Sequence, residues 1–146
     1  MSTDTDTDLT RIAFVCVRNA GRSQMSAAFA ERERDRRGLD VEVLSGGTRP
    51  ADAVHGEVID AMNEVGIDLS DRTPREITAG ELRSCDYVAT MGCSTLDLGD
   101  APGVDVRDWA LDDPGGRDPE RVRAIRDEIA ERVRALFDEV EASATR

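Results

Sequence analysis

The chain has 146 residues, a length typical of one domain with a substantial core. It carries 19 arginines and no lysine against 31 acidic residues, for a net charge of −12. Such an acidic balance argues against nucleic acid and anionic membranes as partners. It also suits a cytoplasm at very high salt, because the Debye length in molar salt is only about 3 Å and long-range repulsion of an anionic substrate is then screened.

The chain contains three cysteines, with neither a secretory signal nor a long apolar run. This pattern predicts a protein of the reducing cytoplasm, where disulfides are usually catalytic or transient. One histidine, His55, and no Cys-x-x-Cys pair give no metal-ligand spacing, so we expect no metal. His55 is expected at a helix end or on the surface.

The predicted elements follow a disordered lead-in over residues 1–10, which is rich in Ser, Thr and Asp. The remaining residues, 11–146, are expected to form one domain. Apolar runs, apolar periodicity and turn residues predict its elements in this order: a strand over 12–15, a turn over 16–23, a helix over about 22–36 ended by Gly38, a strand over 41–44, a turn over 45–48, a helix over 54–65 ended by Gly66, a short helix over about 79–82, strands over 87–91 and 104–108, and a long helix from 119 to about 141.

The helices carry apolar stripes that identify their inward faces. In the first helix we expect Met25, Ala28 and Phe29 to face the core, with residues 31–37 as a solvated charge run. The helix over 54–65 has a stripe of Val58, Ile59, Met62 and Val65. The long helix has one of Val122, Ile125, Ile129, Val133, Leu136 and Val140.

Strands that alternate with helices predict an α/β fold with a parallel sheet. We expect a single three-layer domain with a four-stranded sheet of order 2-1-3-4 and helices on both faces. Ligands in such sheets bind beyond the carboxyl ends of the strands, where the strand order reverses. The first strand ends at Cys16 and the third is followed by Met91-Gly-Cys93, so both thiols are expected at that edge.

The turn Cys16-Val-Arg-Asn-Ala-Gly-Arg-Ser23 predicts an oxyanion site. A strand–loop–helix junction directs backbone N–H groups and the helix dipole into one hollow. Cys16 is the candidate nucleophile, because such a hollow favours the thiolate. Arg22 can hold two oxygens of the anion, and Ser23 can hydrogen-bond the thiolate. The expected oxyanion-binding set is Val17, Arg18, Asn19, Ala20, Gly21, Arg22 and Ser23, with Asn19 in an unusual backbone conformation.

The pattern Cys16-x5-Arg22-Ser23, placed between a strand and a helix and followed by a distal Asp113-Pro114, resembles the low-molecular-weight tyrosine phosphatase family. Within this family the chain looks most like the arsenate reductases, over roughly residues 11–140. Arg18 replaces the glycine typical of the phosphatase loop, and Gly21 replaces a second loop cysteine. A disulfide within the loop therefore cannot form here.

Asp113 is the candidate general acid. The residue before a proline is held extended, and Gly115-Gly116 would let the segment swing over the loop. An aspartic acid at the rim can protonate the departing oxygen of an attacked oxyanion. Asp112 remains an open alternative, whereas Asp105 and Asp108 are expected on the surface.

Cys93 separates a reductase from a phosphatase, because a reductase needs a second thiol to attack the Cys16 sulfur. In the thioredoxin-linked reductases that this chain resembles, a cysteine after the same strand plays that role, and a further cysteine carries the disulfide outward. No such further cysteine occurs over residues 94–100. Cys85 is expected about 20 Å away at the opposite end of the sheet as a buried structural thiol. An external thiol or redoxin would then complete the cycle.

The first hypothesis is therefore a cytoplasmic arsenate reductase without a bound cofactor, acting through Cys16, Arg22, Asp113 and Cys93. The alternative is a low-molecular-weight phosphatase that hydrolyses phosphomonoesters through a phosphocysteine. Against it, phosphotyrosine-selective members carry aromatic residues after the Asp-Pro, where this chain has Gly115-Gly116. A non-enzymatic oxyanion-binding module is least favoured, because it would need neither the acid nor the second thiol.

Overall fold

A four-stranded parallel sheet forms the centre of the computed structural model, which describes residues 10–91, 103–109, 111, 114 and 116–144. Its order is β2-β1-β3-β4, as predicted. The strands are β1 (Thr10–Cys16), β2 (Val41–Gly47), β3 (Tyr87–Met91) and β4 (Asp105–Asp108). The run from Ile12 to Val15 is fully buried, which is typical of a central strand covered on both faces.

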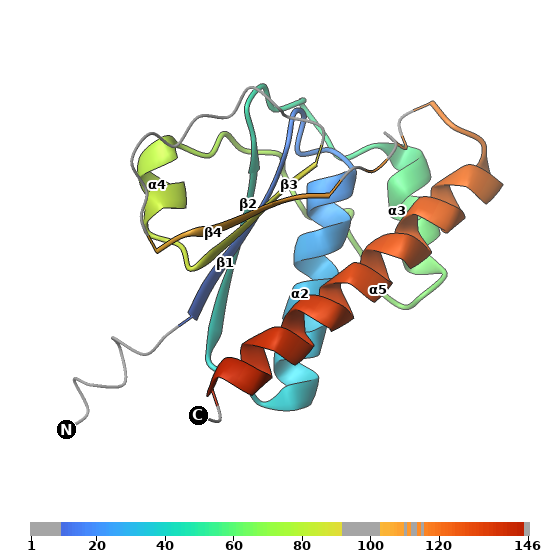
Figure 1. Cartoon of the computed structure of the whole chain (residues 1–146). Helices are drawn as coiled ribbons and strands as arrows, with labels where there is room; N and C mark the ends of the chain where they lie inside the picture. The colour runs from blue at the N-terminus through green and yellow to red at the C-terminus, as the bar shows by residue number, and fades with distance from the viewer. Residues whose placement is uncertain (1–9, 92–102, 110, 112–113, 115, 145–146) are drawn as a thin grey trace.

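The helices of the described residues cover the two faces unequally (Figure 1). The helices α2 (Arg22–Arg37), α3 (Gly56–Asn63) and α5 (Pro119–Ala144) lie on one side of the sheet, and the short α4 (Ala79–Arg83) lies on the other. Gly38 ends α2 with a left-handed backbone (φ 64°), a common helix C-terminus. The three-layer arrangement is therefore confirmed, with one thick and one thin helical layer.

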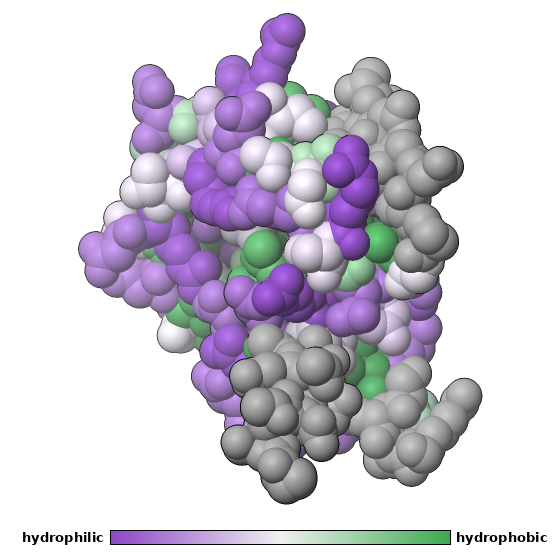
Figure 2. Space-filling model, turned by 90° about the vertical axis from the view of Figure 1, so that its left-hand side faces the viewer, coloured by the Kyte–Doolittle hydropathy of each residue, from purple (hydrophilic) through white to green (hydrophobic). Residues whose placement is uncertain are grey.

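The larger apolar core lies between the sheet and the thick layer. It contains the predicted inward residues of α2 and five of the six predicted stripe residues of α5: Met25, Ala28, Phe29, Ile125, Ile129, Val133, Leu136 and Val140. The sixth, Val122, is also buried. A smaller core beneath α4 contains Ala13, Val15, Ile77, Leu82, Cys85 and Val88. The surface on the α4 side is mostly hydrophilic, with small apolar spots (Figure 2).

No helix in the described part of the chain combines the length and the apolar character needed to cross a bilayer. Even α5, which at 26 residues is the longest of the described helices, has charged side chains between its buried positions.

The strand β2 is longer than the sequence predicts. Residues 45–47, expected in a turn, continue the strand and pair with Phe14, Val15 and Cys16 of β1. Glycine weakens a strand, but here a neighbouring segment of the same chain leaves no room for a side chain. A Cβ atom built on Gly46 would lie 2.4 Å from the Cβ of Ile77. Close packing therefore selects glycine in a strand that propensity alone would end.

Two expectations about the helices need correction. Glu33, placed in a solvated charge run, is only 6% exposed, because Arg36 and Arg37 pair with its carboxylate and offset the cost of its burial. The helix expected over 54–65 is limited to Gly56–Asn63, and only Val58 and Met62 of its stripe are fully buried. Ile59 and Val65 are partly buried against the larger core.

Candidate oxyanion-binding site

The loop that follows Cys16 is held by hydrogen bonds to its outward-facing carbonyl groups. The backbone N–H groups of a neighbouring segment, residues 48–55, donate to four of them: Thr48 to Cys16 (3.3 Å), Arg49 to Val17 (2.8 Å), Ala51 to Arg18 (2.9 Å) and His55 to Ala20 (3.0 Å). The carbonyl dipoles therefore point away from the hollow of the loop. This orientation leaves the N–H side of the loop for an anion.

The start of α2 also favours an anion. Its N-cap residue is Gly21, and no side chain caps the first turn. The first N–H groups of a helix need an acceptor from outside the helix, and they lie at the positive end of its dipole. A tetrahedral oxyanion at this position would satisfy both requirements.

Gly47 allows β2 to touch the loop, a contact that sequence analysis missed. A Cβ atom at Gly47 would lie 2.5 Å from the carbonyl oxygen of Val17 and 3.0 Å from the backbone nitrogen of Asn19. No larger residue fits without displacing the loop backbone. The Gly46-Gly47 pair carried the signal, because glycine within a strand often marks a close approach of another backbone.

Cys16 lies at the base of this loop, with 2% of its surface exposed. Its Sγ atom is 2.9 Å from the Oγ atom of Ser23, and it accepts a hydrogen bond from the backbone N–H of Asn19 at 3.2 Å. Asn19 has the left-handed backbone (φ 53°) that was expected of it. Donors that point at a sulfur atom stabilise its thiolate form, so the loop geometry suits a nucleophilic thiol.

Arg22 connects the loop to the segment that precedes Asp112. Its guanidinium donates a hydrogen bond from Nη1 to the carbonyl oxygen of Leu111 at 3.0 Å. Pro114 also packs on the loop, since a Cβ atom built on Gly21 would lie 2.8 Å from its Cγ atom. The residues that flank the candidate acid thus contact the loop, while Asp112 and Asp113 themselves lie outside the described residues.

The other two thiols differ in what the structure describes. Cys93 lies outside the described residues, but Met91, two positions earlier, pairs with Cys16 across the sheet. Cys85 precedes β3 at the opposite end, because the next strand residues pair Tyr87 with Ile12. Burial raises the pKa of the Cys85 thiol to about 11. Its place as a buried structural thiol is therefore as expected.

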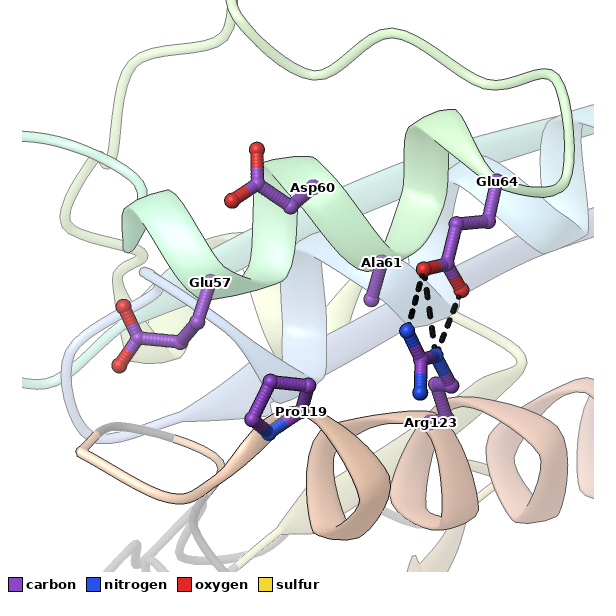
Figure 3. Close-up of a pocket in the computed structure, with 6 residues that line it drawn as sticks. All are labelled: Glu57, Asp60, Ala61, Glu64, Pro119 and Arg123. Carbon is purple, nitrogen blue, oxygen red and sulfur yellow. Dashed lines mark hydrogen bonds and ion pairs between the residues drawn. The ribbon is translucent and has the colours of Figure 1, made fainter.

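A separate hollow of about 260 Å³ lies between α3 and α5 (Figure 3). Its lining comprises Glu57, Asp60, Ala61, Glu64, Pro119 and Arg123. Hydrogen bonds from Arg123 and Arg126 lower the pKa of Glu64 to about 2. An acidic lining repels an oxyanion, so this hollow does not compete with the loop as an anion site.

His55 is the N-cap residue of α3 and is partly buried, which agrees with its expected place at a helix end. Among the described residues, no three His, Cys, Asp or Glu side chains gather in a group that could hold a metal ion. The groups that the structure places at the loop are a thiol, a guanidinium and backbone N–H groups.

Three of the known proteins that are similar to this chain carry the name arsenate reductase. A Halobacterium salinarum protein for which arsenate reductase is the proposed name is 67% identical over 89% of this chain and 92% of its own length. The solved thioredoxin-dependent arsenate reductase of Corynebacterium glutamicum has a TM-score of 0.78 and 34% identity, over 97% of this chain and 67% of its own. A solved arsenate reductase in the phosphate binding state has a TM-score of 0.73 and 31% identity, over 89% of this chain and 98% of its own.

The family match covers the loop and most of the sheet. Residues 11–99 match the sequence model of the family described as low molecular weight phosphotyrosine protein phosphatase. The loop after Cys16, the parallel sheet of order 2-1-3-4 and the arsenate reductase relatives all agree with this match. The chain belongs to the low molecular weight phosphotyrosine protein phosphatase family, and proteins named arsenate reductase are among its relatives.

Proposed function

We propose that this protein is an arsenate reductase, in which Cys16 attacks arsenate and Cys93 resolves the adduct. The observation that carries the proposal is the pairing of Cys16 with Met91. Two residues span at most about 7 Å of extended chain, so the place of Met91 supports a role for Cys93 near Cys16. A phosphatase has no use for a second thiol at this edge of the sheet. The arsenate reductase relatives support the same choice.

In the first step the loop N–H groups and Arg22 bind arsenate. The thiolate of Cys16 forms a bond to arsenic, and an oxygen leaves as water once it has been protonated. Asp113 would supply that proton as the general acid. Arg22 would have to exchange its hydrogen bond to Leu111 for the anion, which would couple substrate binding to the segment that leads to Asp113.

In the second step the thiolate of Cys93 attacks the Cys16 sulfur. The sulfur–sulfur bond forms as the sulfur–arsenic bond breaks, and its electron pair stays on arsenic, which leaves as arsenite. As(V) has then gained two electrons, and the two thiols have become one disulfide. An external thiol or redoxin would restore the thiols, in line with the thioredoxin dependence named for the Corynebacterium glutamicum relative.

We further propose that the enzyme works in the cytoplasm of a salt-adapted cell. A reducing compartment keeps catalytic thiols available between turnovers. The lysine-free chain of net charge −12 and the similarity to a Halobacterium salinarum protein support the salt adaptation.

Phosphatase activity is the second candidate function, because the loop N–H groups and Arg22 would bind phosphate by the same contacts as arsenate, and the matching family is one of phosphatases. The deciding experiment measures arsenate reduction with added thiol, and hydrolysis of an aryl phosphate, for the wild type, Cys16→Ser and Cys93→Ser. The proposal predicts that Cys16→Ser abolishes both activities and that Cys93→Ser abolishes only reduction. Full reduction by Cys93→Ser would refute its resolving role.

The role of Asp113 has a separate test. Asp113→Asn should slow arsenate-adduct formation by about 10²–10⁴-fold, the usual contribution of a general acid, while arsenate binding changes little. The matched control is Asp112→Asn, which removes the neighbouring carboxylate. If Asp112→Asn produces the larger loss, the acid is Asp112.

A further inference from the structure

We infer that Gln24 is a positioning residue, which acts on the Cys16 sulfur through Asn19 and Ser23. Gln24 lies in the first turns of α2 and is 2% exposed. Its side-chain nitrogen is 3.1 Å from the main-chain oxygen of Asn19 and 3.1 Å from the side-chain oxygen of the same residue. Both atoms are acceptors, so the Gln24 atom that faces them must be the amide donor.

The orientation of the Asn19 amide follows from two independent donors. The backbone N–H of Arg75 also points at Asn19 Oδ1, at 3.0 Å. A backbone N–H can only donate, so the Asn19 atom facing it is the oxygen. The other side-chain atom is then Nδ2, which lies 2.6 Å from the Oγ atom of Ser23 and donates to it.

The single proton of the Ser23 hydroxyl is thereby directed to the sulfur. Ser23 Oγ accepts from Asn19, and its own O–H is free to donate to Cys16 Sγ at 2.9 Å. A donor facing the sulfur stabilises the thiolate, which has no proton of its own to give. Gln24, together with the Arg75 backbone N–H, thus fixes the direction of the hydrogen bonds that lead through Asn19 and Ser23 to the nucleophile.

Gln24 has a second effect on the loop. Its bond to the main-chain oxygen of Asn19 turns that carbonyl outward, in the same way that residues 48–55 turn four others. Loss of this bond would free a carbonyl dipole beside the anion hollow, and would leave a buried acceptor without a donor. Both effects weaken the loop as an oxyanion receptor.

The inference rests on Cys16 being the nucleophile of the proposed function, but not on which oxyanion it attacks. The test measures alkylation of the Cys16 peptide by iodoacetamide against pH, using mass spectrometry. Gln24→Met keeps the side-chain volume and removes both donors. The pH midpoint of alkylation should rise by roughly one unit, and the rate at neutral pH should fall roughly tenfold. The Kd for inorganic phosphate should rise by a similar factor.

Three comparisons separate a positioning role from a loss of folding. Gln24→Glu has the same shape but cannot donate when ionised, and its charge also opposes an anion in the loop, so at neutral pH it should lose at least as much as Gln24→Met does. Ile129→Val loosens the core without touching the loop and should keep the wild-type profile. Cys85, which is buried, should resist alkylation in every folded variant.

Two results would overturn parts of the account separately. If the wild-type Cys16 is no more reactive than an ordinary thiol, the proposed function fails. If the wild type is reactive and both Gln24 variants keep its pH profile and its Kd for phosphate, the positioning role of Gln24 is wrong while the proposed function stands.

Discussion

At the scale of single residues, the site depends on positions where a side chain is absent as much as on those where one is present. Gly47 brings the end of β2 against the backbone of Val17 and Asn19, and Gly21 admits Pro114 to the other side of the loop. Between these contacts the loop has little freedom to relax. An anion receptor built from backbone N–H groups needs that rigidity, because it binds only when the groups converge without rearrangement.

Gly47→Ala should therefore damage the loop. Its Cβ atom would lie 2.5 Å from the Val17 carbonyl oxygen, so the loop backbone must shift. We expect inorganic phosphate to bind roughly tenfold more weakly and the fold to lose about 1–3 kcal/mol, the usual cost of overpacking. Titration calorimetry and urea unfolding measure the two effects. Gly56→Ala is the control, since nothing lies within 4 Å of its built Cβ atom, and it should bind phosphate as the wild type does.

The sequence predicted the residues of the loop itself, but not the residues from other parts of the chain that hold the loop in place. Cys16, Asn19 and Ser23 are close in the chain, so their spacing already indicated that they share one turn. The contacts from Gly47, the segment 48–55 and the Arg75 backbone come from far along the chain. No pattern within the loop could reveal them. Gln24 was likewise missed, because a glutamine in a helix usually indicates nothing more than a good helix former.

At the scale of elements, apolar periodicity predicted the long helix α5 well and the short helix α3 poorly. The stripe of α5 is buried at all six of its predicted positions. The helix α3 is shorter than its pattern suggested, and it is attached to α5 partly by charge: Glu64 accepts hydrogen bonds from both Arg123 and Arg126. Such ion pairs between elements cannot be identified from periodicity.

The ion pairs of Glu64 predict a pH-dependent contribution to stability. Its pKa is about 2 in the folded protein, because Arg123 and Arg126 donate to it, against an ordinary value of 4.5. A lowered pKa stabilises the fold above the ordinary value, and this stabilisation is lost as the pH falls through the folded one. Glu64→Gln should therefore be less stable than the wild type at pH 7, and the difference should shrink between about pH 4.5 and pH 2.

Urea unfolding over this pH range provides the measurement. The control is Glu128→Gln, because Glu128 pairs with Arg132 four residues later in the same helix and joins no two elements. It should change stability by less than Glu64→Gln does at pH 7. A Glu64→Gln protein as stable as the wild type at pH 7 would show that the α3–α5 ion pairs contribute nothing.

At the scale of the whole molecule, the alternation of strands and helices was enough to predict a parallel sheet, and the expected order 2-1-3-4 is the order observed. Parallel strands need crossover helices, and right-handed crossovers leave few arrangements of four strands. The unequal helical layers could not be predicted, since they depend on which of two apolar faces each helix covers. The sheet order is also what brings Cys16 beside Met91, so the functional argument depends on this level of structure.

The net charge of −12 predicts a stability that depends on salt. At low ionic strength the acidic surface repels itself, whereas molar salt shortens the Debye length to about 3 Å and removes most of that repulsion. We expect the midpoint of urea unfolding to rise between 0.1 M and 2 M potassium chloride. Sucrose, which strengthens burial without screening charge, should not reproduce the full effect. Equal midpoints at the two salt concentrations would remove the argument for salt adaptation.

The central claim is that two thiols at one edge of the sheet reduce arsenate, and a single-turnover experiment tests it most directly. The fully reduced protein is mixed with arsenate in the absence of any external thiol, in high salt. The account predicts about one arsenite per protein molecule, together with a new disulfide that mass spectrometry assigns to Cys16 and Cys93. Absence of arsenite and of that disulfide, from a protein that still hydrolyses an aryl phosphate, would contradict it.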